Sequence, residues 1–196
     1  ADTGCDLIRV AVPNPKAVEA LAQIKQGSKL PVIADIHFDH RLAIGSIEAG
    51  ADKVRINPGN IEGEAKLKEI ISSAKKKNIP IRIGVNAGST PKDLVKLAEE
   101  YCRFFEAQKF TNIVLSLKSS SVQSTLDAYR RMAQVRDYPL HIGITEAGTE
   151  HYGIIKSSGG IGALLAEGLG DTLRVSLTAD PVKEIETGRY ILKSLG

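Results

Sequence analysis

The feature that most constrains the fold of this chain is a repeated alternation of short β-rich runs with segments of helical apolar spacing. Val, Ile and Leu predominate in each run, and in the segment that follows apolar residues recur every three or four positions. Uninterrupted alternation of this kind is typical of a parallel sheet whose strands are joined by helices. Seven such units are predicted, with β-rich runs at residues 6–12, 31–38, 53–58, 80–87, 112–118, 140–146 and 172–178.

The segments between the runs carry helix start and stop signals. Gly50 and Asn78 stand where two Ala- and Leu-rich helical patterns stop, and either residue commonly closes a helix. Asp180 followed by Pro181 predicts the N-terminus of the last helix. The runs are spaced by roughly thirty residues, as in a TIM-type (β/α)8 barrel. We therefore predict an α/β fold of that type, with seven of its eight βα units present.

The phase of each run predicts which face its side chains occupy. Most runs alternate apolar with polar residues, as where Ile81 and Ile83 alternate with Arg82 and Gly84. Because helices cover the outside of each strand, we expect the apolar phase to face them and the polar phase to face the middle of the barrel. The inward set would comprise Arg9, Lys53, Arg55, Arg82, Lys118 and Arg174, with Asp35 as the main opposing charge and His37, Asn57, Asn86 and Ser176 beside them.

This concentration of positive charge predicts an anionic ligand. Lys and Arg are almost never fully buried unpaired, because removing an ion from water costs several kcal/mol even after relaxation. Guanidinium groups bind phosphate oxygens in a bidentate way, so a small ligand with two or more phosphates is the natural counterion. One such arginine alone would be interpreted as salt-bridged or as reaching for solvent. Six cations in matched phase against one inward acid favour a binding site.

Two further positions are candidates for chemistry. Glu146 stands at the end of a predicted strand, where active-site groups of such barrels lie, and is a candidate general acid or base. A structural role for it, as a loop cap or in an ion pair with a nearby cation, is equally compatible with that position. His37 shares the inward phase of Asp35, but no second histidine lies at ligand spacing on its element, so no metal site is predicted.

Composition limits the class of protein. A chain of 196 residues, 42% hydrophobic and 25% charged, is predicted to form one globular domain over residues 1–196. A net charge of +3 is too balanced for a nucleic-acid-binding protein. Cys5 and Cys102 are isolated, which excludes a zinc or iron–sulfur ligand set built from them and favours a reduced, cytoplasmic protein. No membrane span or targeting segment is predicted.

Several long motifs resemble one known family. CDLIRVAVP (5–13), PVIADIHFDHRLA (31–43), DKVRINPGN (52–60), IPIRIGVNAGS (79–89), SLKSS (116–120), YPLHIGITEAG (138–148) and GIGALLAEGLGDTLRVSLTADP (160–181) together resemble the TIM-barrel domain of the GcpE family, the 4-hydroxy-3-methylbut-2-enyl diphosphate synthases. The resemblance covers essentially the whole chain.

The resemblance implies an oxidoreductase. Members of the family reductively open 2-C-methyl-D-erythritol 2,4-cyclodiphosphate to 4-hydroxy-3-methylbut-2-enyl diphosphate in the non-mevalonate route to isoprenoids. It implies that Glu146 is the acid/base that assists C–O cleavage. The implied diphosphate-binding set is Arg9, His37, Arg55, Arg82, Asn86, Lys118, Arg174 and Ser176.

The chain also departs from the family pattern. Family members carry a C-terminal domain whose cysteines, with a glutamate, hold a [4Fe-4S] cluster, whereas this chain stops after ILKSLG (191–196). They also have a strand upstream of the motif at 5–13, so the missing strand is expected at the N-terminus, and their stretch after residues 86–89 is longer. The chain alone is therefore expected to bind substrate without turnover.

For the complete enzyme, the resemblance implies a homodimer and a ferredoxin- or flavodoxin-type electron donor. It implies a cytoplasmic location, or the plastid stroma for a plant protein. Two alternatives stay open. One is a pterin-binding barrel enzyme of the dihydropteroate synthase type, which Asp35, Asn57 and Lys118 would fit in part. The other is a non-catalytic fragment that only binds a ligand or a partner subunit.

Overall fold

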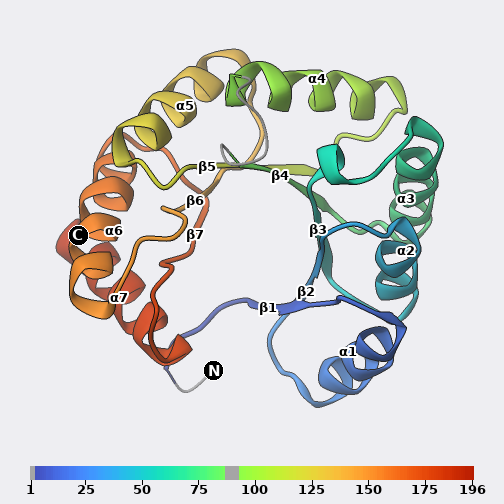
Figure 1. Ribbon diagram of the computed structural model, residues 1–196, viewed down its shortest axis with the longest axis horizontal. Coiled ribbons are helices and arrows are strands. Elements are labelled where there is room, and N and C mark those ends of the chain that lie inside the picture. The colour runs from blue at the N-terminus through green and yellow to red at the C-terminus, as the bar shows by residue number, and fades with distance from the viewer. Residues whose placement is uncertain (1–2, 87–92) are drawn as a thin grey trace. The chain divides into compact units, whose positions relative to one another are not determined.

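The computed structural model describes residues 3–86 and 93–196, and in this part of the chain each of seven strands is followed by a helix (Figure 1). This confirms the predicted α/β class with its seven βα units. The last residue of the run predicted at 80–87 lies outside the described residues. The elements are β1 (Ile8–Ala11), α1 (Pro15–Gly27), β2 (Val32–Ile36), α2 (His40–Glu48), β3 (Lys53–Ile56), the 3-10 helix η1 (Pro58–Asn60), α3 (Glu64–Lys77), β4 (Ile81–Asn86), α4 (Leu94–Ala107), β5 (Ile113–Lys118), α5 (Val122–Val135), β6 (His141–Ile142), α6 (Glu150–Ala166), β7 (Thr172–Leu173) and α7 (Pro181–Ser194).

The chain divides into two compact units. The first contains Cys5–Gly84 and Glu100–Val114, and the second contains Val85–Glu99 and Leu115–Gly196. Strands β1 to β3 belong to the first unit, and β6 and β7 belong to the second. The organisation of residues 1–196 as a single domain stays a prediction.

In the first unit, parallel pairing places the apolar and charged phases on opposite faces of the sheet. The strands follow one another in chain order, β1 to β2 to β3 to β4. Helix α2 packs on β2 and β3, and α1, α2 and α3 lie along the same side of these strands in Figure 1. The apolar phase of β2, β3 and β4 is fully buried and includes Val32, Ala34, Ile36, Val54, Ile56, Ile81 and Ile83, whereas Ile8 and Val10 of β1 are half-buried.

The helix ends agree with the sequence signals. Asp180 accepts a hydrogen bond from the backbone N–H of Val182, and Pro181 begins α7. Asn78 ends α3 with a left-handed backbone (φ 53°), and Gly50 follows α2 with φ 93°. None of the helices described is both long and apolar enough to cross a membrane.

Strands β6 and β7 are shorter than predicted, with two residues each rather than the runs at 140–146 and 172–178. Just beyond β6, the two segments approach each other closely. A Cβ at Gly143 would collide with the carbonyl oxygen of Arg174, and Gly143 has a φ of 155°. Glu146, with φ 50°, then turns the chain out of the extended conformation, and beyond it the two segments share only an isolated bridge between Thr149 and Thr178 among the described residues.

A buried tyrosine joins β5 to β6 where the strand ladder is sparse. These strands share an isolated bridge between Leu115 and Leu140. The Tyr129 hydroxyl, on α5, accepts a hydrogen bond from the Leu117 backbone N–H at 3.0 Å and donates to the His141 carbonyl at 2.6 Å. The hydroxyl thereby takes the place of a strand-to-strand hydrogen bond.

Replacing Tyr129 with phenylalanine should lower the free energy of unfolding by about 1–3 kcal/mol, because two buried backbone groups lose their partner. Urea denaturation monitored by circular dichroism measures the change. Tyr190→Phe is the matched control, since the Tyr190 side chain is exposed and should tolerate the loss of its hydroxyl. Equal stability of the two variants would contradict this role for Tyr129.

Candidate active site

The charged residues of the first unit lie on one face of its sheet. Asp35 pairs in register with Arg55, and Arg55 pairs with Arg82, so these three form one row across the strands. One level nearer the strand starts, Arg9 and Lys53 lie on either side of Ile33. Four of the six predicted cations therefore share a face with the predicted acid.

Asp35 is the centre of this arrangement. Its carboxylate, nearly buried, accepts a hydrogen bond from Arg55 Nη1 at Oδ1 over 3.1 Å. Arg9 Nε lies 3.5 Å and His37 Nε2 lies 3.6 Å from Oδ2. Burial alone would raise the pKa of Asp35, but the charges of Arg9, Arg55 and His37 and the hydrogen bond from Arg55 outweigh it and lower the pKa. Asp35 is therefore ionised at neutral pH.

Lys53 lies in a less favourable environment. Burial and the positive charge of Arg82 both lower the pKa of the Lys53 ammonium. Among the described residues no side chain forms an ion pair with Lys53. The strand positions of this face supply one carboxylate, Asp35, for four cations. The face thus carries an excess of positive charge that an anion would relieve.

Asn57, predicted to lie beside the cations, has a local structural role. Its side-chain oxygen accepts a hydrogen bond from the Gly59 backbone N–H at 3.2 Å and caps η1, and the residue is buried. This engagement weakens the partial fit to a pterin site that Asp35, Asn57 and Lys118 suggested.

In the second unit, Arg174 already has a carboxylate partner. Its Nε lies 3.3 Å from Glu184 Oε2, and its Nη2 donates to Glu184 Oε1 at 3.4 Å. Glu184 Oε1 also accepts the Leu177 backbone N–H at 2.9 Å, which fixes the carboxylate. Sequence reasoning missed Glu184 because it lies on α7, outside the strand pattern that identified the cations.

The other predicted residues of the second unit lie at or near strand ends. Asn86 and Lys118 are the last residues of β4 and β5, and both are half-buried. Ser176 is half-buried in the segment after β7. Lys118 Nζ lies 3.0 Å from the position that a Cβ would occupy at Gly143. The absence of a side chain at Gly143 therefore leaves room for this ammonium group.

Glu146 is exposed in the turn after β6 and has a left-handed backbone, with φ 50°. The other described non-glycine residues with positive φ, Asn78 and Lys109, follow helices, where this conformation is common. Outside a helix end it is strained for a glutamate, and such strain clusters at functional sites. In the described part of the chain its carboxylate has no hydrogen bond or ion pair.

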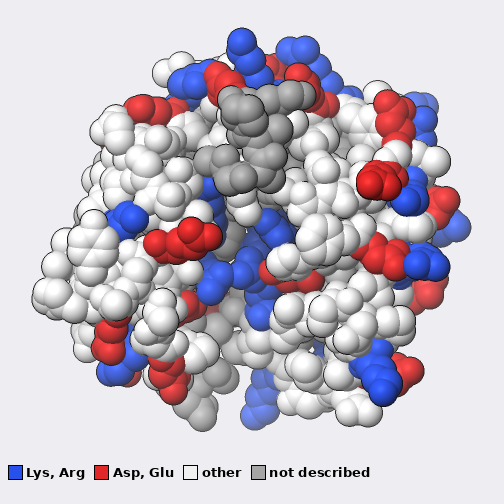
Figure 2. All heavy atoms as spheres, viewed as in Figure 1, with Lys and Arg blue, Asp and Glu red and all other residues white. Residues whose placement is uncertain are grey.

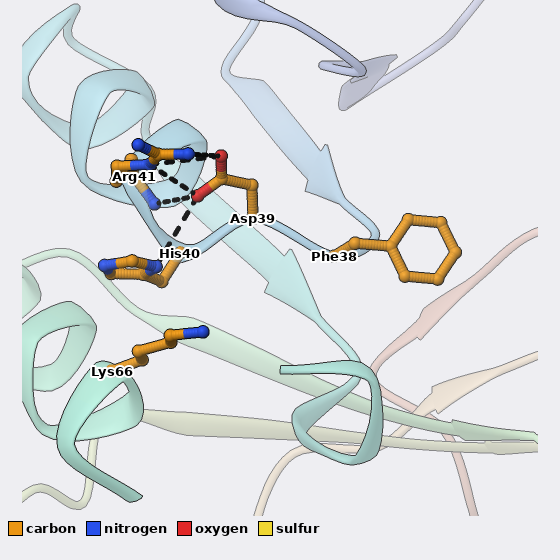
Figure 3. Close-up of a pocket in the computed structure, with 5 residues that line it drawn as sticks. All are labelled: Phe38, Asp39, His40, Arg41 and Lys66. Atoms are coloured by element: carbon orange, nitrogen blue, oxygen red, sulfur yellow. Dashed lines mark hydrogen bonds and ion pairs between the residues drawn. The ribbon is translucent and has the colours of Figure 1, made fainter. Parts of the chain in front are cut away.

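A hollow of about 390 Å³ at the start of α2 is a weaker candidate (Figure 3). Among its charged side chains, Asp39 binds Arg41 over 2.9 Å and caps α2, and Lys66 adds one more cation. His40 lies between Asp39 and Glu69, at 3.5 Å and 3.3 Å. Phe38 points away from these groups in Figure 3 and is 71% exposed. The hollow therefore holds fewer Lys and Arg side chains than the sheet face, which carries Arg9, Lys53, Arg55 and Arg82.

Metal ligation finds no support in the described residues. They contain no group of three or more His, Cys, Asp or Glu side chains able to hold a metal ion. Cys5 donates to the Leu7 carbonyl, and Cys102 is buried in α4. These residues do not fit an iron–sulfur cluster.

On the visible outer surface, basic and acidic side chains are intermixed (Figure 2).

Sequence comparison identifies a family. A family model described as the GcpE TIM-barrel domain matches residues 1–189. The chain is 52% identical over 208 residues to a 4-hydroxy-3-methylbut-2-en-1-yl diphosphate synthase (flavodoxin) of Maridesulfovibrio salexigens, and 53% identical over 207 residues to that of Caldanaerobacter subterraneus subsp. tengcongensis. Each alignment covers 100% of this chain but 58% of the relative.

Structural comparison shows a shared fold at low identity. The dihydropteroate synthase of Yersinia pestis superposes with a TM-score of 0.68 at 13% identity, covering 98% of this chain and 84% of that one. The enzyme of Xanthomonas albilineans, in complex with 7,8-dihydropteroate, gives 0.66 at 13% identity over 98% and 80%. Likeness at this identity concerns the fold alone.

Asp35→Asn should lower the free energy of unfolding at pH 7 by about 1.5–3 kcal/mol, because Arg9 and Arg55 lose their charged partner. The pKa of Asp35 is lowered in the folded state. Its contribution to the free energy of unfolding is therefore fully present above the unfolded pKa of 3.8 and is lost as pH falls through the lower folded pKa. The difference between wild type and variant should therefore shrink from pH 7 to pH 3.

Urea denaturation at both pH values measures this difference. Asp137→Asn is the control, because Asp137 is exposed and should show little change at either pH. A stability difference for Asp35→Asn that stays constant with pH would show that the ion pairs are not its source.

Proposed function

The chain belongs to the GcpE TIM-barrel domain family, and from this premise we propose that it is the substrate-binding part of an oxidoreductase. The enzyme would reductively open 2-C-methyl-D-erythritol 2,4-cyclodiphosphate to 4-hydroxy-3-methylbut-2-enyl diphosphate in non-mevalonate isoprenoid biosynthesis. The names of relatives at 52% and 53% identity support the assignment. Because the chain spans 58% of those relatives, turnover is assigned to the complete enzyme and substrate binding to this chain.

The observation that carries the proposal is the positive face of the first unit. Arg9, Arg55 and Arg82 share it with Lys53, and Asp35 is the single carboxylate among its strand positions. Keeping like charges together in a partly buried place is unfavourable, as the lowered pKa of Lys53 indicates. A diphosphate offers oxygens at the spacing of guanidinium donors and supplies the missing negative charge.

Within the first unit, we assign diphosphate binding to Arg9, His37, Arg55 and Arg82. Asp35 would orient Arg9 and Arg55 before the ligand arrives, so that little reorganisation is needed on binding. The 53% exposed side chain of His37 leaves its ring able to contact a ligand while Nε2 stays near Asp35.

Within the second unit, the same role is proposed for Asn86, Lys118, Arg174 and Ser176. Arg174 would bind phosphate while it keeps its contact with Glu184, which holds the guanidinium in place. Glu146 is proposed as the acid/base that protonates the departing oxygen during C–O cleavage. The exposure of its carboxylate leaves it able to exchange protons.

The electrons for the reduction would come from outside the described residues. The relatives' names include flavodoxin, which supports a flavodoxin-type donor for the complete enzyme. A [4Fe-4S] cluster is proposed for the complete enzyme as its redox group, with no ligands among the described residues of this chain. A homodimer and a cytoplasmic location are proposed on the same family premise. The pterin-binding alternative is not proposed, because the structural likeness concerns the fold alone and the partial residue match is weakened by the capping role of Asn57.

Binding of the cyclodiphosphate, measured by isothermal titration calorimetry, should be detected with the wild-type protein and weakened by Arg55→Ala. Loss of a charged hydrogen-bond donor should cost about 1.5–3 kcal/mol, or roughly 10- to 150-fold in Kd. Arg174→Ala should weaken binding in the same direction.

Arg131→Ala is the matched control. Arg131 is exposed on α5 and pairs with Asp93, so its loss should leave the affinity within experimental error. Absence of cyclodiphosphate binding by the wild type, or tighter binding of a pterin that displaces it, would refute the proposed substrate.

Glu146→Gln should keep the substrate affinity but lower kcat of the complete enzyme by about 10²- to 10⁴-fold, because the amide cannot transfer the proton. A flavodoxin-coupled assay of product formation measures kcat. Glu62→Gln, a change at an exposed position after η1, should leave kcat unaltered. Unchanged turnover in Glu146→Gln would remove this residue from the chemistry.

A further inference from the structure

We infer that Gly84 is a positioning residue for Arg55, because the missing side chain at 84 lets the Arg55 guanidinium lie against β4 in the orientation that binds phosphate. The inference rests on the proposed function for its ligand. Its structural part, the seating of Arg55 on Gly84 and Asp35, can be tested without any ligand.

The sheet register shows where the Arg55 side chain goes. Arg55 is level with Arg82 on the neighbouring strand, and Gly84 lies two residues further along β4. The guanidinium contacts Gly84, so the side chain runs from its own row toward the carboxyl ends of the strands. In barrels of parallel strands, substrate-binding groups are presented at those ends.

The distances show how closely the group is seated. A Cβ added at Gly84 would lie 2.7 Å from Arg55 Nε, 2.9 Å from Nη2 and 3.2 Å from Cζ. It would be nearer to both nitrogens than to the carbon between them, so it lies in front of the Nε–Nη2 edge rather than over the face of the group. Any side chain at 84 would therefore push the guanidinium out of its position.

Asp35 holds the other side of the same group. Arg55 Nη1 donates to Asp35 Oδ1 at 3.1 Å, and the Arg55 side chain is only 12% exposed. The guanidinium is thus fixed between a carboxylate and a bare stretch of backbone. Displacement from Gly84 would strain or break the bond to Asp35, and the two contacts should be lost together.

Alanine at 84 should disturb this position without unfolding the protein. Gly84 does not have the positive φ that only glycine adopts readily, and the three atoms nearest to an added Cβ all belong to the end of the flexible Arg55 side chain. Gly143 near Lys118 is a contrasting case, because a Cβ there would meet the Arg174 backbone. Gly84→Ala therefore separates ligand positioning from folding, whereas Gly143→Ala would not.

The test compares wild type, Gly84→Ala, Arg55→Lys and the double variant by calorimetric titration with 2-C-methyl-D-erythritol 2,4-cyclodiphosphate. We expect Gly84→Ala to raise Kd about tenfold, the scale of one charge-assisted hydrogen bond. Its urea transition should stay cooperative, with a midpoint that falls less than that of Asp35→Asn, because Asp35 loses Arg55 but keeps Arg9. In the Arg55→Lys background the same change should add less than about twofold, since lysine has no fork to displace. Gly162→Ala, where a Cβ meets nothing within 4 Å, is the control.

A second readout needs no ligand. Titration of the Asp35 carboxyl by NMR should show its pKa rising in Gly84→Ala toward the ordinary value, because Arg55 no longer donates to it while Arg9 and His37 remain. Gly162→Ala should leave the titration unchanged. An unchanged Asp35 titration in Gly84→Ala, or equal Kd for wild type and Gly84→Ala, would overturn the inference. Failure of the wild type to bind, with a shifted titration, would refute the proposed ligand but support the positioning of Arg55.

Discussion

The structure of the first unit depends on one buried carboxylate that is shared by several cations. Asp35 brings Arg9, Arg55 and His37 to one point of the sheet face and stays ionised because they surround it. Removing one member of this charged group would leave a partly buried charge without compensation, so the positions of its members depend on one another. In the proposed function, structural pairing and ligand binding would use the same side chains.

The two units solve the problem of partly buried cations differently. In the first, Asp35 is the one carboxylate among strand positions that also carry Arg9, Lys53, Arg55 and Arg82, and it contacts Arg9 and Arg55 directly. In the second, Arg174 has a dedicated carboxylate in Glu184, which is itself fixed by the Leu177 backbone. An arginine that is paired with its own carboxylate can still donate oriented hydrogen bonds, but the pair adds little net positive charge. We therefore regard the first unit as the main source of affinity for a diphosphate in the proposed function.

Fold and chemistry carry different information in this family. Dihydropteroate synthases share the fold at 13% identity, whereas the diphosphate synthases share about half of all residues. A parallel sheet with helices on one side accommodates many reactions, because function depends on side chains at the strand ends. Asn57 is an example: its residue type matches a pterin site, but its side-chain oxygen caps η1 by accepting a hydrogen bond from the Gly59 backbone N–H.

The sequence by itself determined the α/β class, the seven βα units, the helix ends at Asn78 and Asp180, and the shared phase of Arg9 and Arg55. These follow from local propensity and from the two-residue period of a strand, which need no knowledge of distant contacts. Only the tertiary structure decided the early end of β6 at Gly143, the pairing of Arg174 with Glu184 and the seating of Arg55 on Gly84. Each of these depends on the separation of atoms from different elements, and that separation is set by packing rather than by any local pattern.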